Sequence, residues 1–296
     1  MKKIFLILLA VIMVFSIASC GKDSNNNNPD SNNNDNSNNN ENINDNENLQ
    51  ESIGLEFELL SNNEYAVKSI GSCSDVDIVI PAFHNGSPVT EISLGCFKEN
   101  YNIKSVYISK NIRKIGGNAF LKCYLLNSVI IEKNVEEIGG CAFMHCDNLN
   151  NVEFKNGSKL KIIDDYAFEY CAKLTDIDIP DSVTHIGHFA FSECGMLKRI
   201  NIPIGLTTIR TGVFLNCESL TVITLHENIK VVENVAFGLC NSLQIINIPI
   251  SVEFIGPNAF MGCNNLTIKC EVSSKPEAWH EDWNADNCKV YWGVKG

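Results

Sequence analysis

The stretch IGGNAFLKCYLL, Ile115–Leu126, recurs in close variants along most of this chain of 296 residues. Each copy is centred on a phenylalanine, and successive phenylalanines are 23 residues apart, with one step of 25 residues between Phe143 and Phe168. Self-similarity at a fixed period in the twenties is typical of a solenoid, in which each repeat forms one coil. The aligned phenylalanines are Phe97, Phe120, Phe143, Phe168, Phe191, Phe214, Phe237 and Phe260.

One repeat predicts a strand, a turn and a short helical segment. In the copy Leu174–Cys194, apolar and polar residues alternate over Ile177-Asp178-Ile179, which indicates a half-buried strand. Pro180 follows, and its missing N–H suits the end of a strand. The Ala-Phe-x-x-Cys-x-x-Leu segment has apolar residues three apart, which favours a single helical or 3₁₀ turn.

A single repeat cannot bury its own phenylalanine, leucine and isoleucines, whereas stacked repeats bury them in one continuous core. We therefore expect the repeat phenylalanines, and the cysteines three residues after them, to form two internal columns. The core residues are Phe120, Phe143, Phe168, Phe191, Phe214, Phe237 and Phe260, with Cys123, Cys146, Cys171, Cys194, Cys217, Cys240 and Cys263.

These residues resemble the BspA-type leucine-rich repeats of bacterial surface proteins, whose signature is Ile-Gly-x-x-Ala-Phe-x-x-Cys-x-x-Leu followed by an Ile-x-Ile-Pro strand. The resemblance covers about residues 52–292. It implies a leucine-rich repeat solenoid with short parallel strands and a short helical turn in each coil, capped at both ends. The chain departs from the signature at Asp164, Arg210 and Glu233, which replace glycine, and at a two-residue insertion within Phe154–Leu160. We expect local turns there.

The repeat pattern divides the chain into five parts. Residues 1–19 predict a secretory signal peptide, because two lysines precede an apolar run that is short for a membrane span. The resemblance described in the next paragraph implies that it is a lipoprotein signal peptide. Residues 20–51 predict a disordered, asparagine-rich linker with too few apolar side chains to offset the entropy of ordering. An aggregation segment is the alternative, which scattered acids and Pro29 disfavour. Residues 52–91 and 269–296 predict caps around the repeats at 92–268, because terminal repeats must cover an open apolar end.

The ending Ile17-Ala18-Ser19-Cys20 resembles a bacterial lipoprotein processing box. The resemblance implies that Cys20 carries lipid and holds the protein at the extracytoplasmic face of the cell membrane, with the solenoid at the cell surface. Two or more acyl chains give stable anchoring. Ordinary cleavage, or an uncleaved anchor, is the alternative.

Thirteen cysteines in an exported protein raise the question of disulfides. Neighbouring column cysteines would lie about 5 Å apart with parallel Cβ directions, which strains a bridge and favours buried free thiols. A bridge between Cys270 and Cys288, which share the C-terminal segment, stays open. Zinc is disfavoured because no Cys-x-x-Cys pair occurs and the column does not converge on one point.

The formal net charge of −12 argues against nucleic acid and against direct adsorption to anionic lipid. The sequence carries none of the motifs of serine hydrolases, phosphate-binding loops or zinc proteases, and His280–Asn284 fails as a zinc motif at its fifth position. His185 and His188 take positions that Thr208 and Thr211 take one repeat later, so we expect solvated turn residues. We expect no enzymatic activity and no cofactor.

If Ile177 and Ile179 point into the core, their neighbours point outward, and so do the equivalents in every coil. Such solenoid faces form broad binding surfaces. The middle of this face is acidic and its ends are apolar, although a solvated face without a partner is the alternative. The candidate partner-binding residues are Tyr107, Ile130, Glu153, Asp176, Asp178, Arg199, Asn201, Val222 and Ile245.

By the same resemblance, the chain is expected to be a lipid-anchored adhesion module whose partners are host matrix proteins, epithelial surfaces or neighbouring bacteria. Two alternatives remain open: a structural or accessory envelope lipoprotein, and a glycan-binding protein. The glycan hypothesis rests on Trp279, Trp283 and Trp292, which either cover the final coil or offer a platform for stacking sugars.

Overall fold

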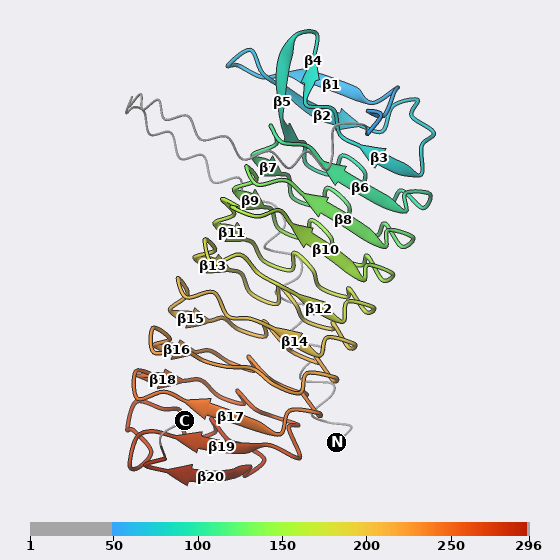
Figure 1. Ribbon diagram of the computed structural model, residues 1–296. Helices are drawn as coiled ribbons and strands as arrows, with labels where there is room; N and C mark the ends of the chain where they lie inside the picture. The colour runs from blue at the N-terminus through green and yellow to red at the C-terminus, as the bar shows by residue number, and fades with distance from the viewer. Residues whose placement is uncertain (1–48, 295–296) are drawn as a thin grey trace. The chain divides into compact units, whose positions relative to one another are not determined.

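The computed structural model describes residues 49–294 of the chain. The chain separates into two units, Met1–Gln50 and Glu51–Gly296, and the second unit holds the repeats. Within residues 49–294 all regular secondary structure is β-strand. Equivalent strands of successive coils lie side by side in two columns (Figure 1). The expected solenoid of 23-residue repeats with short parallel strands is confirmed.

The first column, here called the Ile-x-Ile column, contains the strands expected from the sequence. Strands pair in parallel and in register, so that Val129 lies beside Val106 and Val152 in the core. The strands are β3 (Asp77–Val79), β6 (Ser105–Ile108), β8 (Ser128–Ile131), β10 (Asn151–Phe154), β12 (Asp176–Ile177), β14 (Arg199–Ile200), β17 (Ile245–Ile248), β19 (Thr267–Cys270) and β20 (Lys289–Trp292).

The second column, the Ile-Gly column, lies where the sequence predicts only a turn. Ile138 pairs with Ile115 on one side and with Ile163 on the other. Glycine follows in many copies because the coils approach closely: a Cβ on Gly187 would lie 2.3 Å from the backbone nitrogen of Asp165. The strands are β5 (Ser87–Ile92), β7 (Lys114–Ile115), β9 (Glu137–Ile138), β11 (Ile162–Ile163), β13 (His185–Ile186), β15 (Thr208–Ile209), β16 (Val231–Val232) and β18 (Phe254–Ile255).

The third side of each coil is the Ala-Phe-x-x-Cys segment, and here the expected helical turn is wrong. Every second backbone N–H of the segment donates to the carbonyl three residues earlier, as Cys123 N does to Phe120 O over 3.0 Å. The intervening N–H groups donate to the next coil, as Phe120 N does to Ala142 O over 2.7 Å. A helix satisfies its own backbone, whereas this segment shares half of its hydrogen bonds with its neighbour.

This alternation places left-handed backbone two residues before and two after each phenylalanine, as at Asn118 (φ 56°) and Lys122 (φ 59°). Bulky residues are unusual in that region. Tyr166 and Phe189 nevertheless occupy it, buried, with their ring centroids 5.3 Å apart. Gly212 ends this short stack, because a Cβ there would lie 2.1 Å from the Phe189 ring.

The eight repeat phenylalanines form one buried column through the stack, each at most 1% exposed. Neighbouring ring centroids are 5.0 to 6.2 Å apart, and the rings are nearly parallel. The seven cysteines expected beside them are buried free thiols. Each donates its S–H to the carbonyl of a phenylalanine one coil earlier, over 3.0 to 3.4 Å.

The inserted residues after β10 do not disturb the stack. β10 keeps its register with β8, and β11 keeps its register with β9. The rings of Phe143 and Phe168 on either side of the insertion remain 5.2 Å apart. The two extra residues are therefore absorbed in the loop between β10 and β11.

The first coil is covered by an antiparallel hairpin of β1 (Glu56–Leu59) and β2 (Tyr65–Ser69). β2 pairs in parallel with β5, so the hairpin extends the Ile-Gly column beyond the repeats. The short strand β4 (Phe83–His84) pairs with the other end of β5. His84 stacks on Phe57 with ring centroids 3.9 Å apart, which ties the hairpin to this turn.

Tryptophans cover the last coil. Trp283 stands edge-on against Phe260, with ring centroids 6.1 Å apart, and Trp279 and Trp292 both contact it. Trp279 and Trp283 are only 1% and 4% exposed. The alternative of a sugar-stacking platform is therefore wrong for these two residues, because their faces are buried in the core.

The open question of a Cys270–Cys288 bridge is answered by strand register. Cys270 pairs with Trp292 of the adjacent strand β20. Cys288 precedes Trp292 by four residues, so it lies about 13 Å from that pairing position, at 3.3 Å per residue. A disulfide needs Cα atoms within about 7 Å. Both thiols are free, and Cys288 instead donates to the Cys263 carbonyl, one coil earlier, over 3.4 Å.

Candidate functional site

The outward side chains of the Ile-x-Ile column form the candidate site. Three of the expected residues lie side by side on adjacent strands: Tyr107 on β6, Ile130 on β8 and Glu153 on β10. Tyr107 is half-buried and donates its hydroxyl to Glu132 Oε1 over 2.8 Å. Burial and the Glu132 carboxylate raise the pKa of the Tyr107 phenol. Its polar end is therefore already paired within the protein.

Two further candidates pair on the next strands along the column, Asp176 on β12 and Arg199 on β14. Both are exposed, and Asp178 is exposed in the same coil as Asp176. The hydroxyl of Thr175 donates to Asp176 Oδ2 over 2.9 Å. This part of the face therefore presents charges of both signs to solvent.

Asn201 has a structural role that the sequence does not reveal. Its side-chain amide donates to Ile179 O and accepts from Ile179 N, both over 2.7 Å. The side chain thus replaces the main-chain ladder, and β12 and β14 are two residues long where β6, β8 and β10 have four. Asn247 occupies the equivalent position in the four-residue strand β17, so the residue type alone does not predict this.

The Ile-x-Ile column is interrupted at two places, between β10 and β12 and again after β14. Among residues 49–294, β10 pairs only with β8, and no ladder joins it to β12. A hollow of about 240 Å³ lies between the two strands, and its lining includes Glu153, Asp176 and Asp178. A second hollow of about 680 Å³ adjoins it, between the inserted loop and Asp178. Three expected acids therefore converge at one break in the sheet.

The acidic character of this break is partly neutralised by the inserted loop. Lys155 Nζ lies 2.7 Å from Glu153 Oε1. Lys155 also lines the larger hollow, together with Asn156, Gly157 and Ser158. The insertion expected as a local turn therefore contributes side chains to the candidate face.

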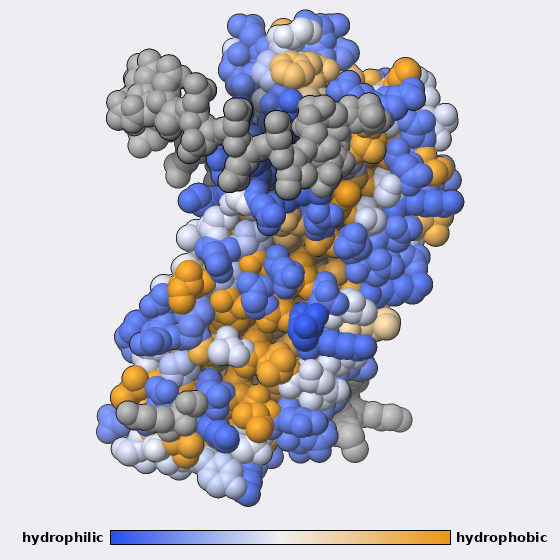
Figure 2. Space-filling model, in the orientation of Figure 1, coloured by the Kyte–Doolittle hydropathy of each residue, from blue (hydrophilic) through white to orange (hydrophobic). Residues whose placement is uncertain are grey.

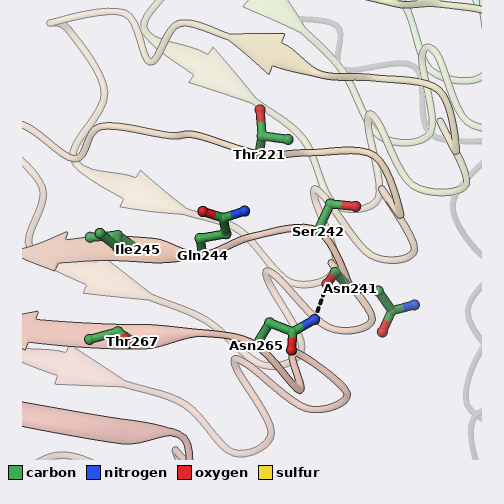
Figure 3. A pocket seen from close by; sticks show the side chains of 7 residues that line it. All are labelled: Thr221, Asn241, Ser242, Gln244, Ile245, Asn265 and Thr267. Atoms are coloured by element: carbon green, nitrogen blue, oxygen red, sulfur yellow. Dashed lines mark hydrogen bonds between the residues drawn. The ribbon is translucent and has the colours of Figure 1, made fainter.

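The remaining candidates form a separate, apolar group. Val222 and Ile245 are bridge partners in adjacent coils and are 53% and 46% exposed. Figure 2 shows apolar side chains gathered in a band along one face, between hydrophilic margins. Ile245 borders a hollow of about 680 Å³ that is otherwise lined by uncharged polar side chains (Figure 3). These are Thr221, Asn241, Ser242, Gln244, Asn265 and Thr267.

His185 is not the solvated turn residue that the sequence predicts, whereas His188 does lie in a turn, with its side chain 37% exposed. His185 lies in β13 and is half-buried, and burial together with Arg210 lowers its pKa. His188 Nδ1 lies 3.6 Å from Glu233 Oε2, which also accepts from the Thr211 hydroxyl over 2.8 Å. The side chains that replace glycine thus surround these histidines in a polar row beside the Ile-Gly column.

Several sequence-based predictions concern residues that the structure does not describe. Cys20, the signal at 1–19 and almost all of the linker at 20–51 lie outside the described residues. Between residues 49 and 294, no three His, Cys, Asp or Glu side chains are arranged to hold a metal ion. The same range has no helix long and apolar enough to cross a membrane.

The fold and this face define the class of protein: a leucine-rich repeat β-solenoid, an architecture typical of non-catalytic binding modules. The particular family follows from the sequence. The BspA type leucine rich repeat region matches six copies, over residues 36–150 and 138–267. Since these matches span more than half of the chain, the protein belongs to the BspA-type leucine-rich repeat family.

Two solved structures agree on the fold. A leucine-rich repeat protein from Bacteroides ovatus is 24% identical with a TM-score of 0.63, covering 83% of this chain and 71% of that chain. The leucine rich repeat protein TpLRR from T. pallidum is 22% identical with a TM-score of 0.56, covering 83% and 100%. A leucine rich cell surface protein from Faecalibacterium prausnitzii is 21% identical over 83% and 98%, with a TM-score of 0.28. No curated protein matches the chain.

Proposed function

We propose that this protein is a cell-surface adhesion module that binds a macromolecular partner through the outward face of its Ile-x-Ile column. One observation carries this proposal: the face is open, and its strand ladder is interrupted between β10 and β12 by hollows that exposed side chains line. An uninterrupted sheet face offers only a flat surface, whereas a break offers backbone groups and recesses that a partner can contact.

The chemistry of the face favours a protein partner. Carboxylates of Glu153, Asp176 and Asp178 lie at the break, and the aliphatic pair Val222 and Ile245 lies further along the column. Protein interfaces combine an apolar centre with polar and charged surroundings, and charge complementarity sets specificity and association rate. A partner with basic and apolar groups on one surface fits this arrangement.

The proposed anchor is lipid at Cys20, which would hold the repeat unit at the extracytoplasmic face of a bacterial membrane. The motif at residues 17–20 supports this part of the proposal. The family membership is consistent with it, since a leucine rich cell surface protein is among the matched structures.

The test is a capture experiment with the chain starting at Gly21, using immobilised extracellular matrix and epithelial surface proteins. Replacing Glu153, Asp176 and Asp178 by lysine should abolish capture. A matched variant carries lysine at the exposed acids Glu136, Glu253 and Glu277, and makes the same change in net charge away from the face. Equal loss in both variants, or capture that survives the first, would refute binding through this face.

A glycan ligand is the second candidate, and it now rests on different residues. The hollow beside Ile245 is lined by hydroxyl and amide side chains and has no charged side chain, a set suited to a neutral, hydroxyl-rich ligand. Binding on a glycan array that is lost in Gln244→Ala and Asn265→Ala, but kept in the lysine variant of the acidic break, would favour this candidate over adhesion to protein. No ligand of either class would leave a structural envelope role.

A further inference from the structure

Apart from the internal breaks, the two strand columns have four outer ends. Such ends need protection, because an unpaired strand edge is a template for another strand. Three of these ends are closed in the described residues. β1, at the N-terminal end of the Ile-Gly column, carries Glu56 and Glu58 and has an irregular register. β3 is covered by Ser52, which donates its N–H to Val79 O and accepts from Val79 N, both over 3.0 Å. Charge, irregularity and cover are the usual means of closing an edge.

The C-terminal end of the Ile-Gly column is covered by the cap. His280 N donates to Ile255 O of β18 over 2.9 Å, and Asn258 N donates to Asp282 O over 2.9 Å. The fourth end, β20, is different. It is the last strand of the sheet β17-β19-β20 (Figure 1), and within residues 49–294 no strand pairs with its outer edge.

The register of the stack shows which backbone groups of β20 are exposed. In this column the inward residues offer their carbonyls to the following coil: Ile248 O accepts from Glu271 N, and Cys270 O accepts from Val294 N. Val290 and Trp292 take the same positions as Ile268 and Cys270 in the ladder. The N–H and C=O groups of Val290 and Trp292 therefore point away from β19, toward a coil that the described chain does not supply.

β20 has fewer of the features that protect the other ends. Its four residues are Lys289, Val290, Tyr291 and Trp292, with no proline and no bulge, and its pairing with β19 is regular. Lys289 is the one charge, and its Nζ lies 4.7 Å from the centre of the Tyr291 ring. Tyr291 is 42% exposed.

We propose that two copies of this chain associate by antiparallel pairing of β20 with β20. A two-fold axis at Tyr291 places Val290 opposite Trp292 of the second copy, and each such pair exchanges two N–H···O bonds. Tyr291 then lies opposite Tyr291 of the second copy, in the position between these pairs, where an aromatic pair is favourable. Lys289 faces Gly293 of the second copy, so no like charges are opposed. Every outward N–H and C=O group of Val290 and Trp292 then has a partner in the second copy. This self-complementarity favours a second copy over an unrelated strand.

Sedimentation velocity of the chain starting at Gly21, over a series of concentrations, should show a reversible monomer–dimer equilibrium. Val290→Pro removes one outward donor and keeps the N–H of Tyr291, which faces β19, so it should weaken association at least tenfold. Val290→Thr is the control and should still dimerise. A monomer at all concentrations, or a dimer unaffected by Val290→Pro, would overturn the proposal.

A crosslinking pair tests the register without depending on the proline variant. Tyr291→Cys places two thiols directly opposite each other, within reach of a disulfide, whereas Lys289→Cys places them about 13 Å apart along the paired strands. Mild oxidation should give a covalent dimer with Tyr291→Cys only, with the wild-type chain as the control for native thiols. Equal crosslinking of the two variants, or none with Tyr291→Cys, contradicts this pairing. Because the edge is distant in sequence from the β10–β12 break, failure here leaves the proposed adhesion face intact.

Discussion

The thiol of Cys194 donates a hydrogen bond over 3.2 Å to the carbonyl oxygen of Phe168, one coil earlier in the stack. The same carbonyl also accepts from the backbone N–H of Cys171 over 3.1 Å. Each interior coil repeats this relationship, so the thiol column and the phenylalanine column are joined through the backbone. The cysteine is both a small apolar side chain and the donor that satisfies the second lone pair of a buried carbonyl.

Truncating one interior ring should destabilise the whole unit. Phe191→Ala should lower the free energy of unfolding by about 3–5 kcal/mol, because the ring is fully buried between Phe168 and Phe214 and leaves a cavity. Urea denaturation followed by circular dichroism measures it. Phe83→Ala is the matched control, since Phe83 is 54% exposed and should change the value little. Similar values for the two variants would contradict the stacked core.

Alkaline pH should weaken the fold through the thiol column. Burial raises the pKa of six column cysteines, Cys123, Cys146, Cys171, Cys194, Cys217 and Cys240. A raised folded-state pKa gives stability that is complete below the unfolded value, about 8.5, and is lost as pH rises above it. The free energy of unfolding should therefore fall from pH 8 to pH 10, with about 1.4 kcal/mol per pH unit from each thiol once the unfolded thiol is ionised.

Cys194→Ala separates this effect from the titration of other groups. The variant should be less stable at pH 8, because the thiol fills space and satisfies a carbonyl. Its free energy of unfolding should fall less steeply with pH, by about 1.4 kcal/mol per pH unit, which is the contribution of one thiol. Urea denaturation at pH 8, 9 and 10 gives both slopes. Parallel slopes for the variant and the wild type would show that Cys194 does not titrate in this way.

Removing the Asn201 side chain should destabilise the middle of the Ile-x-Ile column. Asn201→Ala leaves the N–H and C=O of the buried Ile179 without their side-chain partner, at a cost of about 1–3 kcal/mol. Hydrogen exchange at the Ile179 amide should accelerate by the corresponding factor. Thr224→Ala, at the equivalent exposed position one coil later, should leave stability and exchange nearly unchanged.

The three tryptophans should report on the C-terminal end alone, because the sequence has no others. Trp279 and Trp283 are buried, so most of the emission should be blue-shifted and protected from iodide in the native state. Trp279→Ala should lower the thermal midpoint, since its ring packs on Trp283 with centroids 5.0 Å apart. A shift in tryptophan emission on adding soluble sugars, without unfolding, would instead support the hypothesis that the tryptophans stack against sugars.

The proposed anchor predicts a change in cell fractionation. Cys20→Ala should move the protein from the membrane fraction to the soluble extracytoplasmic or secreted fraction, because acyl chains supply the membrane affinity. Ser19→Thr, which keeps Cys20, is the control. Retention of Cys20→Ala in the membrane fraction would mean that another part of the chain holds it there.

The sequence predicts the solenoid because its periodicity is a physical constraint. Phe120 and Phe143 recur at the same phase, and only stacking in register buries both. The outward positions of Tyr107, Ile130 and Glu153 follow from the period of two along a strand, and the structure places these residues on adjacent strands. Where a residue contacts only its equivalent in the next coil, the spacing of the repeat is enough to predict that contact.

The third side of the coil could not be predicted in this way. Three-residue spacing of apolar side chains is shared by a helical turn and by the alternating turns observed, and the choice depends on where the backbone hydrogen bonds go. Phe120 N bonds to the next coil rather than to its own, which requires left-handed residues such as Asn118 and Lys122. No signal within a single repeat shows that its donors belong to a neighbour.

The amino-acid sequence by itself determined the repeat, the buried columns and the family, because these depend on residue types recurring at a fixed interval. Only the tertiary structure decided where the regularity ends: the break between β10 and β12, the amide of Asn201 in place of a ladder, and the open edge at β20. These features arise from hydrogen bonds between coils. A side chain that replaces a backbone partner, or a strand edge without a partner among residues 49–294, changes the surface without changing the period.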